Sequence, residues 1–225
     1  MSAAQEHAAE TFAADTKNHT AKILRDDGLY RHVRCEQPGQ YSWNQWWEVV
    51  TWPHHLAIAG DMGCYVFSRV EDMFGFFRHG KGEQTINPGY WAQKIQASDY
   101  ARGDGNGVRQ YAPDAFRKAV LSDLELRLES CGDALTKGQK KELRESVDRN
   151  VLAYAEDGEH EVREAVEGYC DPLCAGGRRI EGWRQLDFQD FWEHDLTEYA
   201  DRFLWCLHAI VWTVHRYDEM KGEKV

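Results

Sequence analysis

The sequence lacks a hydrophobic run long enough to cross a membrane. Its longest apolar stretch, residues 203–214, spans 12 residues and includes His208 and Thr213, whereas a transmembrane helix needs about 20. The first 20 residues also lack a basic start followed by an apolar segment, the pattern of a signal peptide. We therefore expect a protein of the cytoplasm that has no membrane partner.

An excess of positive charge is also missing. The chain has 27 basic and 38 acidic side chains, so its formal net charge is −11. A general nucleic-acid binder needs a basic surface that displaces counterions from phosphates. Docking on an anionic membrane needs basic clusters as well. The composition therefore argues against direct binding of nucleic acid by the whole surface.

The motifs of common catalytic and metal sites are absent. The sequence contains no HExxH, no paired CxxC, no GxxxxGK[ST] and no GxSxG. Its six cysteines are scattered, which is typical of reduced thiols, and Pro172 separates Cys170 from Cys174 so that no helix can aim both thiols the same way. We expect no catalytic residue, no metal and no cofactor, and an enzyme is the less favoured class.

Hydrophobic residues, at 42% of the chain, are numerous enough for a folded core. Alternating segments rich in β-formers predict three or four strands, over residues 30–36, 46–52, 56–59 and 64–67. Helical periodicity predicts a short helix near Val70 that Ser68 caps. Further helices are expected over residues 3–25, 113–130, 136–155 and 159–169, and one or two more over residues 188–217.

These elements predict an α+β protein, with a small N-terminal antiparallel sheet packed against a mostly helical C-terminal half. We divide the chain into residues 1–112, with a helix, a β-meander and a short helix, and residues 113–225, an acidic helical region. The two parts are expected to form one compact unit.

Negative charge is concentrated in the second part, which has a net charge of −9 against −2 in the first. Residues 156–171 and 181–201 each contain seven acids against one arginine. Carboxylates along a helix face are about 5–6 Å apart, so such a face can imitate the phosphates of a nucleic acid. The alternative is a solvated face that only keeps the protein soluble. The predicted partner-binding residues are Glu156, Asp157, Glu161, Glu164, Glu167, Asp190, Glu193 and Glu198.

Two histidines, His54 and His55, precede the turn that contains Asp61. Side chains at strand ends can converge, so these three residues and Arg69 form an alternative candidate pocket for a small molecule. Adjacent residues of a strand point to opposite faces, which favours a structural role for the two histidines.

Tryptophan is crowded into the N-terminal part, at positions 43, 46, 47, 52 and 91. One face of a small sheet cannot bury all five side chains. Because tryptophan is enriched at interface hot spots, exposed members of this group predict a homodimer through the Trp-rich N-terminal half.

The segment GDMGCYVFSRVEDMFGFFR (residues 60–78), followed by INPGYW (86–91), resembles an uncharacterised family of accessory proteins of tailed bacteriophages and prophages. The resemblance covers about residues 23–130 and begins near LRDDGLYRH (24–32). It implies a context rather than an activity, since small acidic phage proteins without catalytic motifs resemble inhibitors of host defence, including anti-CRISPR proteins.

Two functional hypotheses follow, from different classes. The first is a phage-encoded, non-enzymatic inhibitor in the host cytoplasm that binds a host defence nucleoprotein complex through its acidic, nucleic-acid-mimicking surface. The alternative is an anti-defence protein that binds or hydrolyses a nucleotide signal at the pocket near His54, His55 and Asp61. A role in phage DNA metabolism or assembly stays open.

Overall fold

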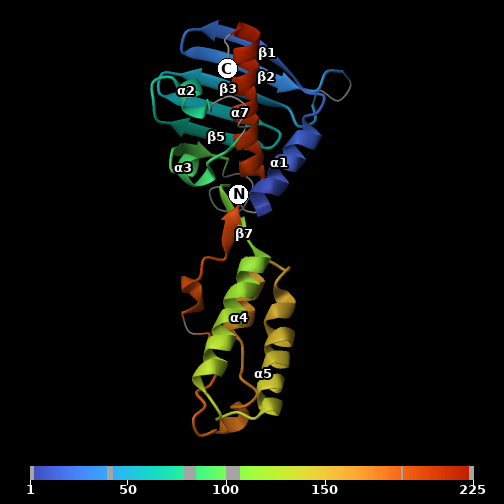
Figure 1. Cartoon of the computed structure of the whole chain (residues 1–225), viewed down its shortest axis with the longest axis vertical. Helices are drawn as coiled ribbons and strands as arrows, with labels where there is room; N and C mark the ends of the chain where they lie inside the picture. The colour runs from blue at the N-terminus through green and yellow to red at the C-terminus, as the bar shows by residue number, and fades with distance from the viewer. Residues whose placement is uncertain (1–2, 40–42, 79–84, 100–106, 189, 223–225) are drawn as a thin grey trace. The chain divides into compact units, whose positions relative to one another are not determined.

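A computed structural model describes residues 3–39, 43–78, 85–99, 107–188 and 190–222 (Figure 1). The chain forms two compact units. Unit 1 comprises Met1–Gln110 and Tyr199–Val225, and unit 2 comprises Tyr111–Glu198. The chain leaves unit 1 within β7 (Arg109–Tyr111) and returns within β8 (Thr197–Tyr199), two strands that pair with each other.

Unit 1 is built on a six-stranded antiparallel meander in the order β1-β2-β3-β4-β5-β6, which confirms the α+β prediction. Its strands are β1 (Thr20–Asp27), β2 (Tyr30–Glu36), β3 (Trp47–Trp52), β4 (His55–Gly60), β5 (Gly63–Ser68) and β6 (Ile95–Ser98). Strands β3, β4 and β5 alternate buried and partly exposed residues, the period-2 pattern of a sheet with one covered face. The sheet is larger than the three or four strands expected.

Helix α7 (Asp201–Lys221) covers one face of this sheet, together with α1 (Ala3–Asp15), α2 (Met73–Phe77) and α3 (Pro88–Ala92) (Figure 1). Every residue from Phe203 to Val214 is buried, as expected of a helix that is apolar on all sides. The division at residue 112 therefore needs correction: the last helix lies in unit 1, because its apolar surface is buried against the sheet.

Two further expectations in unit 1 are wrong. The predicted helix 3–25 ends at Asp15, and Thr20–Asp27 forms an edge strand instead. Helix α2 is capped by Asp72 rather than Ser68, because the Asp72 carboxylate accepts the backbone N–H of Phe74 at 3.0 Å. The same carboxylate accepts two hydrogen bonds from Arg31 of β2, at 2.7 and 3.0 Å, so one side chain both caps the helix and ties it to the sheet.

Unit 2 is mostly helical. It contains α4 (Pro113–Ser130), α5 (Lys137–Asn150), α6 (Glu159–Glu167) and the 3₁₀ turns η2 (Leu152–Tyr154), η3 (Ala175–Gly177) and η4 (Phe191–Glu193). Thr136 caps α5 through a capping box with Gln139, which confirms the predicted helix start. Residues 188–217 were expected to form one or two helices, but the α-helix begins only at Asp201, because Asp190 adopts a left-handed backbone (φ 61°) and β8 intervenes.

Within the described part of the chain, no helix has the length and apolar character that crossing a bilayer requires.

A buried ion pair predicts a large effect of one substitution in unit 1. Arg78, just after α2, donates two hydrogen bonds of 2.7 Å to Asp218 of α7, whose side chain is 2% exposed. Arg78→Met leaves a buried carboxylate without this partner, and we expect a loss of about 3 kcal/mol in the free energy of unfolding. Urea unfolding followed by tryptophan fluorescence measures it. Arg216→Met is the control, because it removes the exposed ion pair with Glu219 and should lower the free energy of unfolding by less than about 0.5 kcal/mol. Equal losses in the two variants would contradict the larger contribution of the Arg78–Asp218 pair.

The buried His208 predicts a pH dependence of stability. Burial lowers the pKa of His208 from 6.5 to about 4, so the native state excludes a proton that the unfolded chain binds below pH 6.5. The contribution of the neutral His208 to the free energy of unfolding is therefore complete above pH 6.5. It is lost as the pH drops toward 4, by at most about 1.4 kcal/mol per pH unit. His208→Phe should flatten this part of the stability curve, whereas His7→Gln, an exposed residue, should leave it unchanged. An identical curve for His208→Phe would show that His208 is not the group responsible.

Candidate functional site

The acids of the first window lie around α6. Val162 and Val166 are buried, so the opposite side of the helix carries the exposed Glu161, Glu164 and Glu167. Glu156 and Asp157, also exposed, lie in the turn that precedes the helix. Glu156 forms an ion pair of 2.8 Å with Arg117. The structure thus leaves all five predicted residues exposed on α6 and the turn before it, and two of them, Glu161 and Glu164, line one groove.

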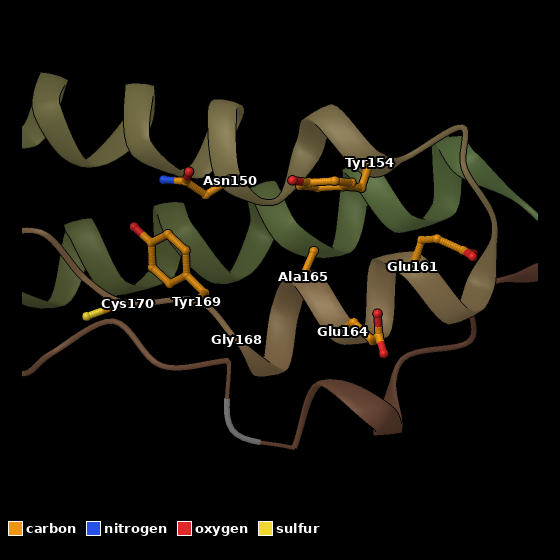
Figure 2. Close-up of a pocket in the computed structure, with 8 residues that line it drawn as sticks. All are labelled: Asn150, Tyr154, Glu161, Glu164, Ala165, Gly168, Tyr169 and Cys170. Carbon is orange, nitrogen blue, oxygen red and sulfur yellow. The ribbon is translucent and has the colours of Figure 1, made fainter.

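A groove of about 540 Å³ runs along α6, and we call it the α6 groove. Its lining residues are Asn150, Tyr154, Glu161, Glu164, Ala165, Gly168, Tyr169 and Cys170. Figure 2 shows Tyr154 and Asn150 on one wall and Ala165 of α6 on the facing wall. Glu161 and Glu164 lie toward one end of the groove, and Tyr169 and Cys170 lie toward the other.

Some polar groups of the α6 groove form hydrogen bonds within the protein, and others have no ion pair among the described residues and can contact a partner. Asn150 and Tyr169 each donate a hydrogen bond to the hydroxyl of Ser146, at 3.1 and 3.4 Å. Burial raises the pKa of Tyr169 to about 12, so its hydroxyl remains a donor at neutral pH. Glu164 lies 3.5 Å from His160, while Glu161 forms no ion pair with any residue described. A groove lined by carboxylates and a tyrosine ring suits a lysine or arginine side chain of a partner.

Three acids of the second window, Asp187, Asp190 and Glu193, line another groove of about 550 Å³ together with Asp123, and we call it the η4 groove. Its lining residues are Asp123, Leu126, Arg127, Ser130, Leu186, Asp187, Asp190, Glu193 and His194. Two of these acids have partners: His194 lies 3.1 Å from Asp123, and Arg127 lies 3.4 Å from Asp187. Asp190 and Glu193 are exposed and have no ion pair among the described residues.

Exposed apolar side chains accompany the η4 groove, and the sequence analysis missed them. Leu126 on the groove is 62% exposed, and Trp192, between Phe191 and Glu193, is 67% exposed. Tryptophan anchors are enriched at the centres of protein interfaces. The position of Trp192 inside an acidic window was a sequence signal for an interface. The exposure of Leu126 depends on how α4 packs, and no sequence pattern reports it.

Two acids of these windows are not open surface charges. Glu198, predicted to bind a partner, lies in β8 and is only partly exposed. Asp171 is fully buried, and its carboxylate accepts hydrogen bonds from Leu173 N, Trp183 Nε1 and Leu186 N at 2.8–3.0 Å. Asp171 therefore fixes the fold of unit 2 rather than its surface.

The alternative pocket is not assembled. His55 begins β4, where it pairs with Ser68, while Asp61 follows the other end of the same strand, so six residues separate them along an extended chain. That is about 20 Å at 3.3 Å per residue. His54 and Arg69 do meet, since Arg69 N donates to His54 O at 3.2 Å. His55 stacks on Trp52 with ring centroids 5.0 Å apart, which is a packing role.

The five N-terminal tryptophans have different environments. Trp47 and Trp91 are buried in the core of unit 1, and Trp46 and Trp52 are partly exposed. Trp43 is 67% exposed and is the member of this group most available to a second copy.

In the part of the chain that the structure describes, no three His, Cys, Asp or Glu side chains are grouped so that they could hold a metal ion. Cys170 is exposed and Cys174 is partly exposed, and both are free thiols. Comparison of the chain with protein-family models, with curated proteins and with solved structures finds no match.

The role of Asp171 predicts the effect of a conservative substitution. Asp171→Asn replaces one of the two acceptor oxygens by a donor, so a buried N–H group loses its acceptor. We expect a loss of about 2–3 kcal/mol in the stability of unit 2, detected as a shifted unfolding transition in urea. Asp157→Asn, at an exposed position, is the matched control and should shift the transition little. If both variants unfold at the same urea concentration as the original protein, Asp171 does not hold this region.

Proposed function

We propose that the protein is a non-enzymatic binding protein, and that its acidic unit 2 occupies a basic, nucleic-acid-binding surface of a partner protein. The observation that carries the proposal is the coincidence of acids and grooves. Glu161 and Glu164 line the α6 groove, and Asp190 and Glu193 line the η4 groove. Grooves with available carboxylates can accept the arginine and lysine side chains of such a surface.

The charge distribution supports the proposal at longer range. Unit 2 contains 21 acidic and 12 basic side chains, a net charge of −9 out of −11 for the whole chain. A field of one sign steers a partner of opposite sign during association and adds strong salt dependence. Leu126 and Trp192 supply apolar anchors, which charge alone would not provide.

The resemblance to phage accessory proteins suggests the kind of partner. We propose a host defence nucleoprotein complex in the host cytoplasm, with the acidic surface in place of its nucleic acid. A homodimer through the Trp-rich half of unit 1 stays a prediction, for which the exposed Trp43 is the available anchor.

A charge-reversal experiment tests the proposal. The tagged protein is used to capture partners from a nuclease-treated host lysate, washed at low and at high salt, and captured proteins are quantified by mass spectrometry. We expect a stoichiometric nucleic-acid-binding partner that high salt releases. The triple variant Glu161→Lys/Glu164→Lys/Glu193→Lys should lose it, because the variant repels a basic surface.

The matched control is Glu6→Lys/Glu10→Lys/Glu71→Lys, which changes the net charge equally but alters exposed residues of unit 1. It should retain the partner. Loss of the partner in both variants would mean that only total charge matters. Retention in both, at low and at high salt, would contradict binding through the acidic grooves.

A further inference from the structure

One end of unit 2 departs from the acidity of the rest, and we call it the basic end. It comprises residues 131–141, the connection into α5 with the first residues of that helix, and residues 174–185, a loop that contains η3. These segments hold six basic and two acidic side chains, a net charge of +4, whereas the remainder of unit 2 has a net charge of −13.

The two segments are neighbours in the fold. A Cβ atom on Gly182 would lie 3.0 Å from the Cβ of Ala134, so the loop contacts the connection between α4 and α5. Figure 1 shows the loop beside the lower ends of these two helices. Asp171 closes the base of the loop, because Leu173 N and Leu186 N both donate to its carboxylate. The loop is therefore a compact element with joined ends, a type of loop that is frequently functional.

The tip of the loop carries two adjacent arginines after two left-handed glycines. Gly176 and Gly177 have φ values of 68° and 79°, which favour glycine and leave the backbone uncovered by side chains. Arg178 and Arg179 follow, both exposed, and neither forms an ion pair or hydrogen bond with a residue that the structure describes. Two exposed arginines without a carboxylate partner among the described residues therefore lie next to each other in a unit with 21 acidic side chains.

A groove of about 600 Å³ lies against these arginines. Both guanidinium-bearing residues line it, together with Cys174, Gly177, Ile180, Glu181, Trp183 and Gln185. Its volume is in the range of small-molecule sites. Arginine presents several N–H donors in a planar fork that matches phosphate oxygens, and Gln185 adds a neutral polar group.

The start of α5 adds positive charge to the basic end. Lys137, Lys140 and Lys141 lie at the beginning of this helix, whose first turn contains no acid. Cations at a helix N-terminus oppose the helix dipole, so the placement of these lysines lowers the stability of the helix rather than raising it. Lys140 donates to Gly132 O at 2.9 Å and Lys141 lies 3.5 Å from Glu145, whereas Lys137 has no ion pair among the described residues. All three lysines add to the positive potential of the basic end.

We propose that the basic end of unit 2 binds a compact phosphate-bearing ligand, such as a nucleotide, in the groove beside Arg178 and Arg179. The size of the ligand follows from the surrounding charge. A long polyanion would extend beyond about 8 Å, the screening length at physiological salt, and would meet the carboxylates of the remaining surface. A mononucleotide stays within the basic end. This inference does not rest on the acidic grooves, which lie at other lining residues of unit 2.

Calorimetric titration of the full chain with inorganic pyrophosphate and with a nucleoside triphosphate, in buffer without phosphate, tests the proposal. We expect both ligands to bind, and binding to weaken at high salt. Arg178→Ala/Arg179→Ala should weaken it at least tenfold, and Arg178→Lys/Arg179→Lys should retain part of it because charge remains without the fork. Lys118→Ala/Arg149→Ala removes the same charge from two exposed positions outside the basic end and should weaken binding less than twofold.

Three outcomes would overturn the proposal. One is the absence of heat and of any change in melting temperature with either ligand. Another is an equal loss of binding in the alanine and control variants, which would mean that only net charge matters. The third is a single-stranded oligonucleotide or a polyglutamate peptide that binds more tightly than the nucleotide, because the site would then accept an extended polyanion. None of these results depends on whether a partner protein is captured by the acidic grooves.

Discussion

Burial of α7 against the six-stranded sheet is the contact on which unit 1 depends. The helix comes last in the chain, yet its residues from Phe203 to Val214 are buried in the same core as strands β2–β5. One polar link inside this core fixes the position of the helix: Trp47 of β3 donates to the Thr213 hydroxyl at 2.8 Å, and that hydroxyl donates to Ala209 O at 2.7 Å. A buried polar pair that is fully hydrogen-bonded can specify one arrangement of helix and sheet.

This topology has a consequence for unit 2. The segments before and after unit 2 both belong to unit 1, so unit 2 is an insertion in the chain of unit 1, and α7 follows the insertion. Its own core is smaller and is organised partly by a buried carboxylate, Asp171. Unit 2 also carries most of the negative charge, −9 of the −11 of the whole chain. The basic end shows that this charge is distributed with a pattern rather than evenly.

Much of the fold could be predicted from the sequence where one physical rule acts alone. Alternation predicted the bounds of β2. Pro113, a residue that suits the first position of a helix, and the N-cap Thr136 marked the starts of α4 and α5. Strand β1 was missed because it is an edge strand with few buried residues, so its sequence shows little alternation. The acidic surface was predictable from counting charges. The grooves, the exposed Trp192 and the separation of Asp61 from His55 depend on tertiary packing, which no local pattern reports.

The proposed function requires the acidic surface to take the place of a nucleic acid on its partner. Competition tests it most directly: the captured partner is loaded with a fluorescent nucleic acid, and the fluorescence anisotropy is followed as the intact protein is added. We expect the protein to displace the nucleic acid, and we expect this displacement to weaken as the salt concentration rises. Simultaneous binding of protein and nucleic acid, with unchanged anisotropy at saturation, would contradict it.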